Sequence, residues 1–212
     1  RQRTLVERLA RTHPHLRLVQ VYGLHPWEAR TATQEQVDQA MIELERELSG
    51  AHVAAVGELG LDRVRKDEGW EMQVHAFDSQ LALAKRFKRP LVLHVVRAHA
   101  QALGMLKTGG PWSGLVHTFS GDYAAAKKYL AMGFLLSMSV KSLESERGCA
   151  LVKQIPAGSW VVETDAPDQK PDSFQGDLNE PAALLGAAHL LPVGGEDTGA
   201  LTKLFPTLAA PL

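Results

Sequence analysis

Five side chains that could bind a metal ion each follow a short apolar run of the sequence. Three are histidines, His25 in "GLHP", His94 in "VLHV" and His117 in "LVHTFSG", and two are acids, Glu58 in "VGELGLD" and Asp165 in "VVETDAP". A single histidine beside an apolar run is most often an ordinary core or surface residue. Five such residues in equivalent positions form the mixed imidazole and carboxylate set that binds Zn, Mn or Mg. The sequence therefore predicts a divalent-metal centre.

The elements that must position these side chains alternate along the chain. Short apolar runs predict six strands, at residues 16–23, 52–57, 90–94, 114–117, 134–137 and 160–163. Helical patterns lie between them, including a capping box at Thr33 to Gln36 and an apolar face that begins at Trp70. Such alternation is typical of a parallel α/β sheet, either doubly wound or closed as a (β/α)8 barrel. A barrel brings all strand ends to one mouth, so we expect the barrel.

Composition narrows the classes of protein further. A chain of 212 residues that is 45% hydrophobic fits a single domain over residues 1–212. No apolar run is long enough to span a membrane and the first residues lack a secretory signal, which predicts a cytoplasmic protein with no membrane partner. The net charge of −1 argues against coating duplex nucleic acid. The single cysteine, Cys149, lies in a helical pattern and is interpreted as packing.

The remaining histidines lack the strand-end placement, and we predict ordinary roles for them. They are His13, His15, His52, His75, His99 and His189. The "HPH" at 13–15 has the spacing of a metal pair, but it precedes a strand and Pro14 breaks the alternation.

Two acids end the last predicted strand, and alternation points both to the same side. Asp165 lies further out, before Pro167, where it can reach a metal and its bound water. For Glu163 we favour a hydrogen-bonding role that supports a ligand over direct metal binding.

Six ordered motifs resemble the TatD-type metal-dependent deoxyribonucleases, a branch of the amidohydrolase-like barrels. They are "GLHP", "AVGELGLD", "LVLHVVRAH", "GLVHTFSG", "VVETDAPD" and "QGDLNEP", and the resemblance runs from about Val21 to Pro181. It implies that Glu58 bridges two divalent ions (Mg, Mn or Zn) and that His94 and His117 complete one ion's ligands. It also implies that Asp165 belongs to the other ion and that His25 and Arg97 face the substrate phosphates.

The chain also departs from this family pattern. It lacks the H-x-H pair that family members carry at the end of a first strand, and it has six predicted strands instead of eight. We therefore expect a barrel truncated at its N-terminus, with one metal site half built and with exposed sheet edges.

The resemblance implies hydrolysis of phosphodiester bonds at DNA ends or in a small phosphodiester, and we predict no obligate protein partner. Asp165 would orient or deprotonate the attacking water. Two alternatives stay open: hydrolysis of amides, lactones or other esters by the same ligand set, and a catalytically impaired metal-binding remnant.

Overall fold

Six strands alternate with helices along the described part of the chain. The computed structural model describes residues 8–9, 11–13, 18–50, 52–65 and 68–186. The strands are β1 (Gln20–Tyr22), β2 (Val53–Asp62), β3 (Leu91–Val96), β4 (Gly114–His117), β5 (Phe134–Ser139) and β6 (Trp160–Glu163). The helices are α2 (Pro26–Thr31), α3 (Gln34–Leu48), α4 (Trp70–Phe87), α5 (His99–Leu106), α6 (Tyr123–Ala131), α7 (Val140–Leu143), α8 (Glu146–Val152) and α9 (Ala183–Gly186).

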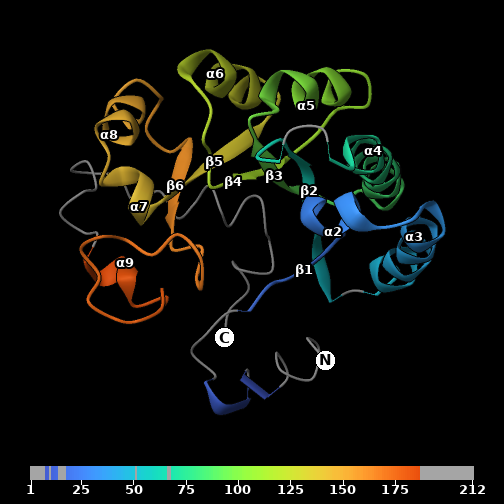
Figure 1. Ribbon diagram of the computed structural model, residues 1–212, viewed down its shortest axis with the longest axis horizontal. Helices are drawn as coiled ribbons and strands as arrows, with labels where there is room; N and C mark the ends of the chain where they lie inside the picture. Colours follow the sequence, from blue (N-terminus) through green and yellow to red (C-terminus); the bar gives the residue numbers. More distant parts are fainter. Residues whose placement is uncertain (1–7, 10, 14–17, 51, 66–67, 187–212) are drawn as a thin grey trace.

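The strands form one parallel sheet in the order β1-β2-β3-β4-β5-β6. Each strand therefore pairs with its neighbour in the sequence, without the reversal of order that defines a doubly wound sheet. The sheet curves into an arc, and α3, α4, α5, α6 and α8 lie along its outer side (Figure 1). This is the arrangement of a barrel wall, and it confirms the predicted barrel-type α/β class.

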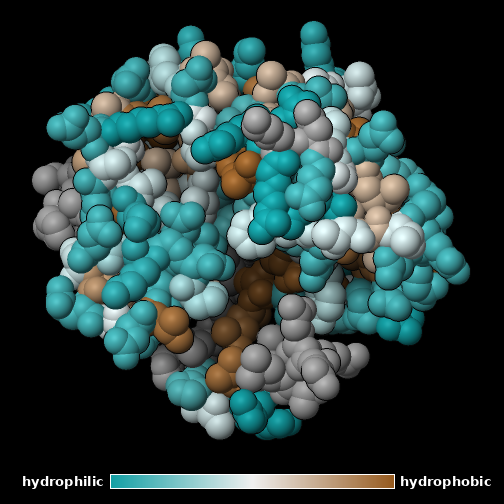
Figure 2. All heavy atoms as spheres, in the orientation of Figure 1, coloured by the Kyte–Doolittle hydropathy of each residue, from teal (hydrophilic) through white to brown (hydrophobic). Residues whose placement is uncertain are grey.

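The large hydrophobic core lies between the sheet and these helices. Leu59, Leu93, Leu136 and Phe77 are fully buried within it. A small second cluster, built on Ala55 and Val92, involves alternate strand positions. On the face shown in Figure 2, hydrophobic residues gather in a central hollow and hydrophilic residues surround it.

Helix starts follow the sequence closely. Thr33 caps α3, and both hydrogen bonds of the predicted capping box with Gln36 are present. Helix α4 begins at Trp70, as its apolar pattern predicts. Cys149 lies in α8 as predicted, is half-buried, and its thiol donates to the Leu143 carbonyl over 2.9 Å.

Four strands differ in length from the prediction: β3 and β5 each end two residues later than predicted, and β2 and β1 differ more. Strand β2 continues five residues beyond the predicted end at Gly57, because its ladder with β3 runs on to Asp62 and because Leu59 and Leu61 are buried. Strand β1 is shorter than predicted and begins at Gln20. Residues 16 and 17 of that predicted strand lie outside the described residues.

None of the described helices is both long enough and apolar enough to cross a bilayer.

Candidate metal centre

Glu58 stands at the centre of the candidate site. The pairing of β2 with β3 is irregular between Gly57 and Leu59, so Glu58 sits at a bulge that turns its side chain out of the strict alternation. Its Oε2 lies 3.7 Å from His25 Nε2, 3.9 Å from His94 Nδ1 and 3.7 Å from His117 Nε2. One carboxylate oxygen is thus surrounded by three imidazole nitrogens from three other segments.

These separations suit a shared cation better than direct hydrogen bonds. Two ligand atoms that each lie about 2.1 Å from one ion at near-tetrahedral angles stand roughly 3.4–3.7 Å apart. Among the described residues, one group could hold such an ion, formed by His25, Glu58 and His94, with ligand atoms within 4.8 Å of one another. The donor set therefore fits a divalent metal of the Zn or Mn type.

His25 reaches the site from the start of α2. It is the N-cap residue, its Nδ1 accepts a hydrogen bond from the Trp27 backbone N–H over 3.2 Å, and its Nε2 faces Glu58. Burial, together with the nearby His94, lowers the pKa of His25 to about 4. The imidazole is therefore neutral near pH 7, which is the form that binds metals. The family resemblance implied phosphate contact for His25, whereas the geometry groups it with the candidate ligands.

His94 is oriented by a buried acid that the sequence reasoning did not select. Its Nε2 lies 3.1 Å from Asp62 Oδ2, and the same carboxylate accepts hydrogen bonds from Trp27 Nε1 over 2.6 Å and from the Val64 backbone N–H over 2.7 Å. Burial alone would raise the pKa of Asp62, but these hydrogen bonds outweigh it and lower the pKa to about 2. A carboxylate that fixes the far nitrogen of an imidazole is typical of metal-binding histidines.

His117 lies between two acids at the end of β4. Its Nδ1 is 2.8 Å from Glu163 Oε2, and its Nε2 is 2.9 Å from Asp165 Oδ1. Burial lowers its pKa, but the two carboxylates and Glu58 outweigh burial and raise the pKa to about 10. Glu163 also accepts hydrogen bonds from the N–H and hydroxyl of Thr118, each over 2.6 Å. Its contacts are those expected of the supporting role predicted for it.

Asp165 lies two residues beyond β6, in a left-handed backbone conformation with a φ of 58°. Asp tolerates this region better than most residues do. Asn179, which is buried, holds the turn, because its amide donates to the Thr164 carbonyl over 2.6 Å and also to the Asp168 carbonyl. The "QGDLNEP" stretch therefore supports Asp165 from 14 residues away.

Most of the predicted site residues line one cavity of about 790 Å³. It brings together His25, Glu58, His94, His117 and Asp165, and Trp27 and Asp62 line it as well. Arg97 is exposed and does not line this cavity. It lines a neighbouring cavity instead, so its predicted phosphate contact would lie beside the metal site.

The other histidines within the described residues lie outside this cavity. His52 precedes β2 and pairs with Glu47, His75 lies on α4 and faces Asp38, and His99 packs against Phe119. His13 is exposed near the start of the chain. His15 and His189 lie outside the described residues.

Comparison with known proteins points to one family. The family model described as TatD related DNase matches residues 3–192. The chain is 34% identical over 162 residues to an uncharacterized metal-dependent hydrolase, YjjV, of Escherichia coli, which covers 75% of this chain and 62% of that protein. It is 36% identical over 154 residues to the 3'-5' ssDNA/RNA exonuclease TatD of Cronobacter sakazakii, covering 68% of this chain and 56% of that protein.

The same likeness holds in three dimensions. The crystal structure of the TatD homologue YjjV from Escherichia coli superposes with a TM-score of 0.78 at 29% identity, covering 98% of this chain and 82% of that chain. The chain spans about three fifths of the length of the curated relatives that it matches.

Proposed function

Because the chain belongs to the TatD related DNase family, we propose that it is a divalent-metal-dependent hydrolase that cleaves phosphodiester bonds at the ends of single-stranded nucleic acid. The single observation that carries this proposal is the Glu58 carboxylate, which stands at 3.7–3.9 Å from three imidazole nitrogens in an open cavity. The exonuclease names of several relatives support the choice of substrate. We expect activity in the cytoplasm without an obligate protein partner.

Glu58, His25 and His94 would hold one cation. Asp165 and His117 would contribute to a second, with Glu58 between the two groups, and binding there would displace the proton that the carboxylates hold on His117. A divalent cation bound there supplies positive charge to the phosphoryl group and lowers the pKa of a bound water. This grouping differs from the one that the resemblance implied, because His25 takes the place beside Glu58 and His94 that was assigned to His117. Each ion would be Mg, Mn or Zn.

Asp165 is the group best placed to handle the proton of the attacking water. Asp165 lines the cavity, and its Oδ1 is hydrogen-bonded to His117, which holds it in place. The water oxygen forms the new bond to phosphorus and one water proton passes to Asp165, while the bond to the leaving oxygen breaks and that oxygen takes up a proton from solvent. The products are a phosphate monoester and a free hydroxyl.

Metal binding gives the first test. The Glu58→Gln variant keeps the shape of the side chain and removes its charge, so it should weaken binding of Mn or Zn by more than roughly 100-fold in calorimetry. Glu43→Gln, on the exposed side of α3, is the matched control and should bind as the parent does. A Glu58→Gln protein that binds metal as tightly as the parent would overturn the assignment.

Substrate choice gives the second test. The metal-loaded chain should hydrolyse bis(4-nitrophenyl) phosphate and shorten fluorescent single-stranded oligonucleotides from an end. Rapid hydrolysis of a lactone or an amide without phosphodiester cleavage would overturn the nuclease proposal. Tight metal binding with no turnover of any of these compounds would instead identify an impaired remnant.

A further inference from the structure

Three cationic side chains line a second cavity beside the metal centre. This cavity measures about 530 Å³ and is lined by Arg97 after β3, Lys128 on α6 and Arg147 on α8. All three residues are exposed. They come from three separate segments, so the fold collects their charges at one place.

The positive charge of this cavity is poorly compensated. Among the described residues, no ion pair includes Arg97, Lys128 or Arg147. Asp122 is the acid that lines the cavity, and its Oδ1 accepts a hydrogen bond from the Ala125 N–H at the start of α6. The helix terminus therefore offsets part of the negative charge of Asp122, and an excess of cations remains.

Arg147 is held rigidly enough to act as a fixed binding group. Its Nη2 donates to the carbonyls of Ser120 over 2.9 Å and of Gly121 over 3.2 Å. These bonds leave the other guanidinium N–H groups available, because guanidinium carries five donors. A planar cation with free donors is the group that best recognises a phosphate.

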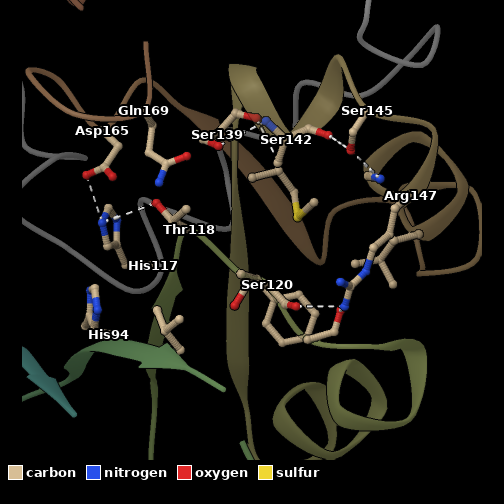
Figure 3. Close-up of a pocket in the computed structure, with 16 residues that line it drawn as sticks. His94, His117, Thr118, Ser120, Ser139, Ser142, Ser145, Arg147, Asp165 and Gln169 are labelled. Carbon is tan, nitrogen blue, oxygen red and sulfur yellow. Dashed lines mark hydrogen bonds and ion pairs between the residues drawn. The ribbon is translucent and has the colours of Figure 1, made fainter. Parts of the chain in front are cut away.

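A third cavity, of about 280 Å³, lies between this cationic cavity and the metal centre. It shares His94, His117 and Asp165 with the metal cavity, and it shares Ser120 and Arg147 with the cationic one. Figure 3 shows His94, His117 and Asp165 on one side of this third cavity and Arg147 on the other.

Hydroxyl groups line part of the third cavity. These hydroxyls belong to Thr118, Ser120, Ser139, Ser142 and Ser145, and the rest of the lining is largely apolar, with Phe119, Met138 and Leu151 among it. Hydroxyls and cations are the usual partners of phosphate and sugar oxygens, and they carry no base preference. The three cavities thus share lining residues from the metal centre to Arg147.

We propose that the cationic cavity is a subsite for a backbone phosphate of single-stranded nucleic acid, one or more nucleotides away from the phosphodiester at the metal centre. This inference rests on the proposed function, and it adds Lys128 and Arg147 to the phosphate contact expected of Arg97. The subsite would let a chain of net charge −1 bind a strand locally, since three cations line one cavity.

The test is oligonucleotide binding to the 212-residue chain in the presence of EDTA, so that no metal contributes. Fluorescence anisotropy of labelled single strands of increasing length is measured over a range of salt concentrations. The variants are Lys128→Gln and Arg97→Gln. Lys127→Gln is the matched control, because Lys127 immediately precedes Lys128 in α6, stacks on Tyr123 and does not line the cavity.

Lys128→Gln and Arg97→Gln should each raise the Kd for long strands by roughly three- to tenfold, and each should reduce the salt slope by about 0.7. The difference from the parent should shrink as the strand is shortened, whereas Lys127→Gln should follow the parent throughout. If Lys128→Gln binds every length as Lys127→Gln does, the subsite is overturned.

Hydrolysis of bis(4-nitrophenyl) phosphate by the metal-loaded parent separates the two proposals. This compound carries one phosphate, so it cannot place a phosphate at the metal centre and another in the cationic cavity. If it is cleaved while Lys128→Gln binds strands as the parent does, the subsite fails and the hydrolase proposal stands. If strands bind through Lys128 but no phosphodiester is cleaved, the subsite stands and the hydrolase proposal fails.

Discussion

At the scale of single residues, the buried carboxylate of Asp62 links an indole to a candidate metal ligand. Trp27 Nε1 and His94 Nε2 both meet its Oδ2, at 2.6 Å and 3.1 Å. An ionised carboxylate in this position favours the imidazole tautomer that carries its proton on Nε2 and leaves Nδ1 free to face Glu58. The acid therefore acts on the site through His94.

We predict that Asp62→Asn weakens metal binding by about 10- to 100-fold, because an amide holds the His94 tautomer less firmly. Calorimetry with Mn or Zn measures the loss. Asp38→Asn, on the exposed face of α3, is the control and should leave the affinity unchanged. Equal affinities for Asp62→Asn and the parent would show that His94 needs no such support.

A second prediction at this scale concerns His99 and the stability of the protein in acid. Its ring packs against Phe119 and Tyr129, and burial is the main cause that lowers its pKa from 6.5 to about 4, with Asp122 opposing and Arg147 reinforcing the shift. Between these pH values the unfolded chain binds more protons at His99 than the folded protein does. The free energy of unfolding should therefore fall as the pH falls through this window.

Urea denaturation at pH 7 and at pH 4.5 tests the point. His99→Leu should lose less stability between the two pH values than the parent, whereas His75→Leu, at a partly exposed position, should lose as much as the parent. Equal losses of stability between the two pH values in all three proteins would show that His99 does not cause the decrease.

At the scale of elements, the contact between β2 and β3 decides where His94 lies. Gly60 has a φ of 148° and pairs with His94, and a Cβ at this position would clash with the His94 carbonyl oxygen. A side chain there would push the two strands apart, next to the candidate ligands.

Gly60→Ala should therefore destabilise the protein by roughly 1–3 kcal/mol and weaken metal binding as well. Gly104→Ala is the contrasting control, because Gly104 lies in α5 with no atom within 4 Å of an added Cβ. It should stabilise the protein by about 0.5–1 kcal/mol. Thermal unfolding measures both changes, and a neutral Gly60→Ala would mean that the strands can separate at little cost.

The sequence predicted strands best where a strand is a simple apolar run. Strands β4 and β6 have the predicted bounds, and the end of each places His117 and Glu163 as expected. The length of strand β2 was underestimated, because its second half alternates buried leucines with Glu58 and Asp62. Those polar residues resemble a loop in the sequence, and only the pairing with β3 reveals them as strand.

The site was predicted in part for a related reason. The strand-end rule selected His117 at the end of β4 and Asp165 just after β6, whereas Glu58 and His94, which it also selected, lie inside β2 and β3. Asp62 was missed because its partners, Trp27 and His94, lie 35 and 32 residues away in the sequence. The neighbouring cavity around Arg97 also depends on three segments that no local pattern connects.

At the scale of the whole molecule, the arc leaves two strands with one partner each. Within the described residues, β1 pairs only with β2, and β6 pairs only with β5. Unpaired strand edges offer free N–H and carbonyl groups to other chains. A hydrophobic hollow on one face adds a second reason for association (Figure 2).

We therefore predict that the 212-residue chain self-associates as its concentration rises. Sedimentation velocity should show larger species at higher concentration. A single monomeric species at every concentration would indicate that the edges are covered in solution.

The amide of Asn179 joins the two ends of the segment from Thr164 to Asn179. The position of Asp165 therefore does not depend on how many residues lie between these ends. Residues inserted or deleted between 169 and 178 would change the size of a loop whose two ends are already joined, at a cost in entropy that grows only slowly with length. Homologous or engineered chains could therefore differ in this stretch, and carry different surfaces there, while Asp165 keeps its place beside His117.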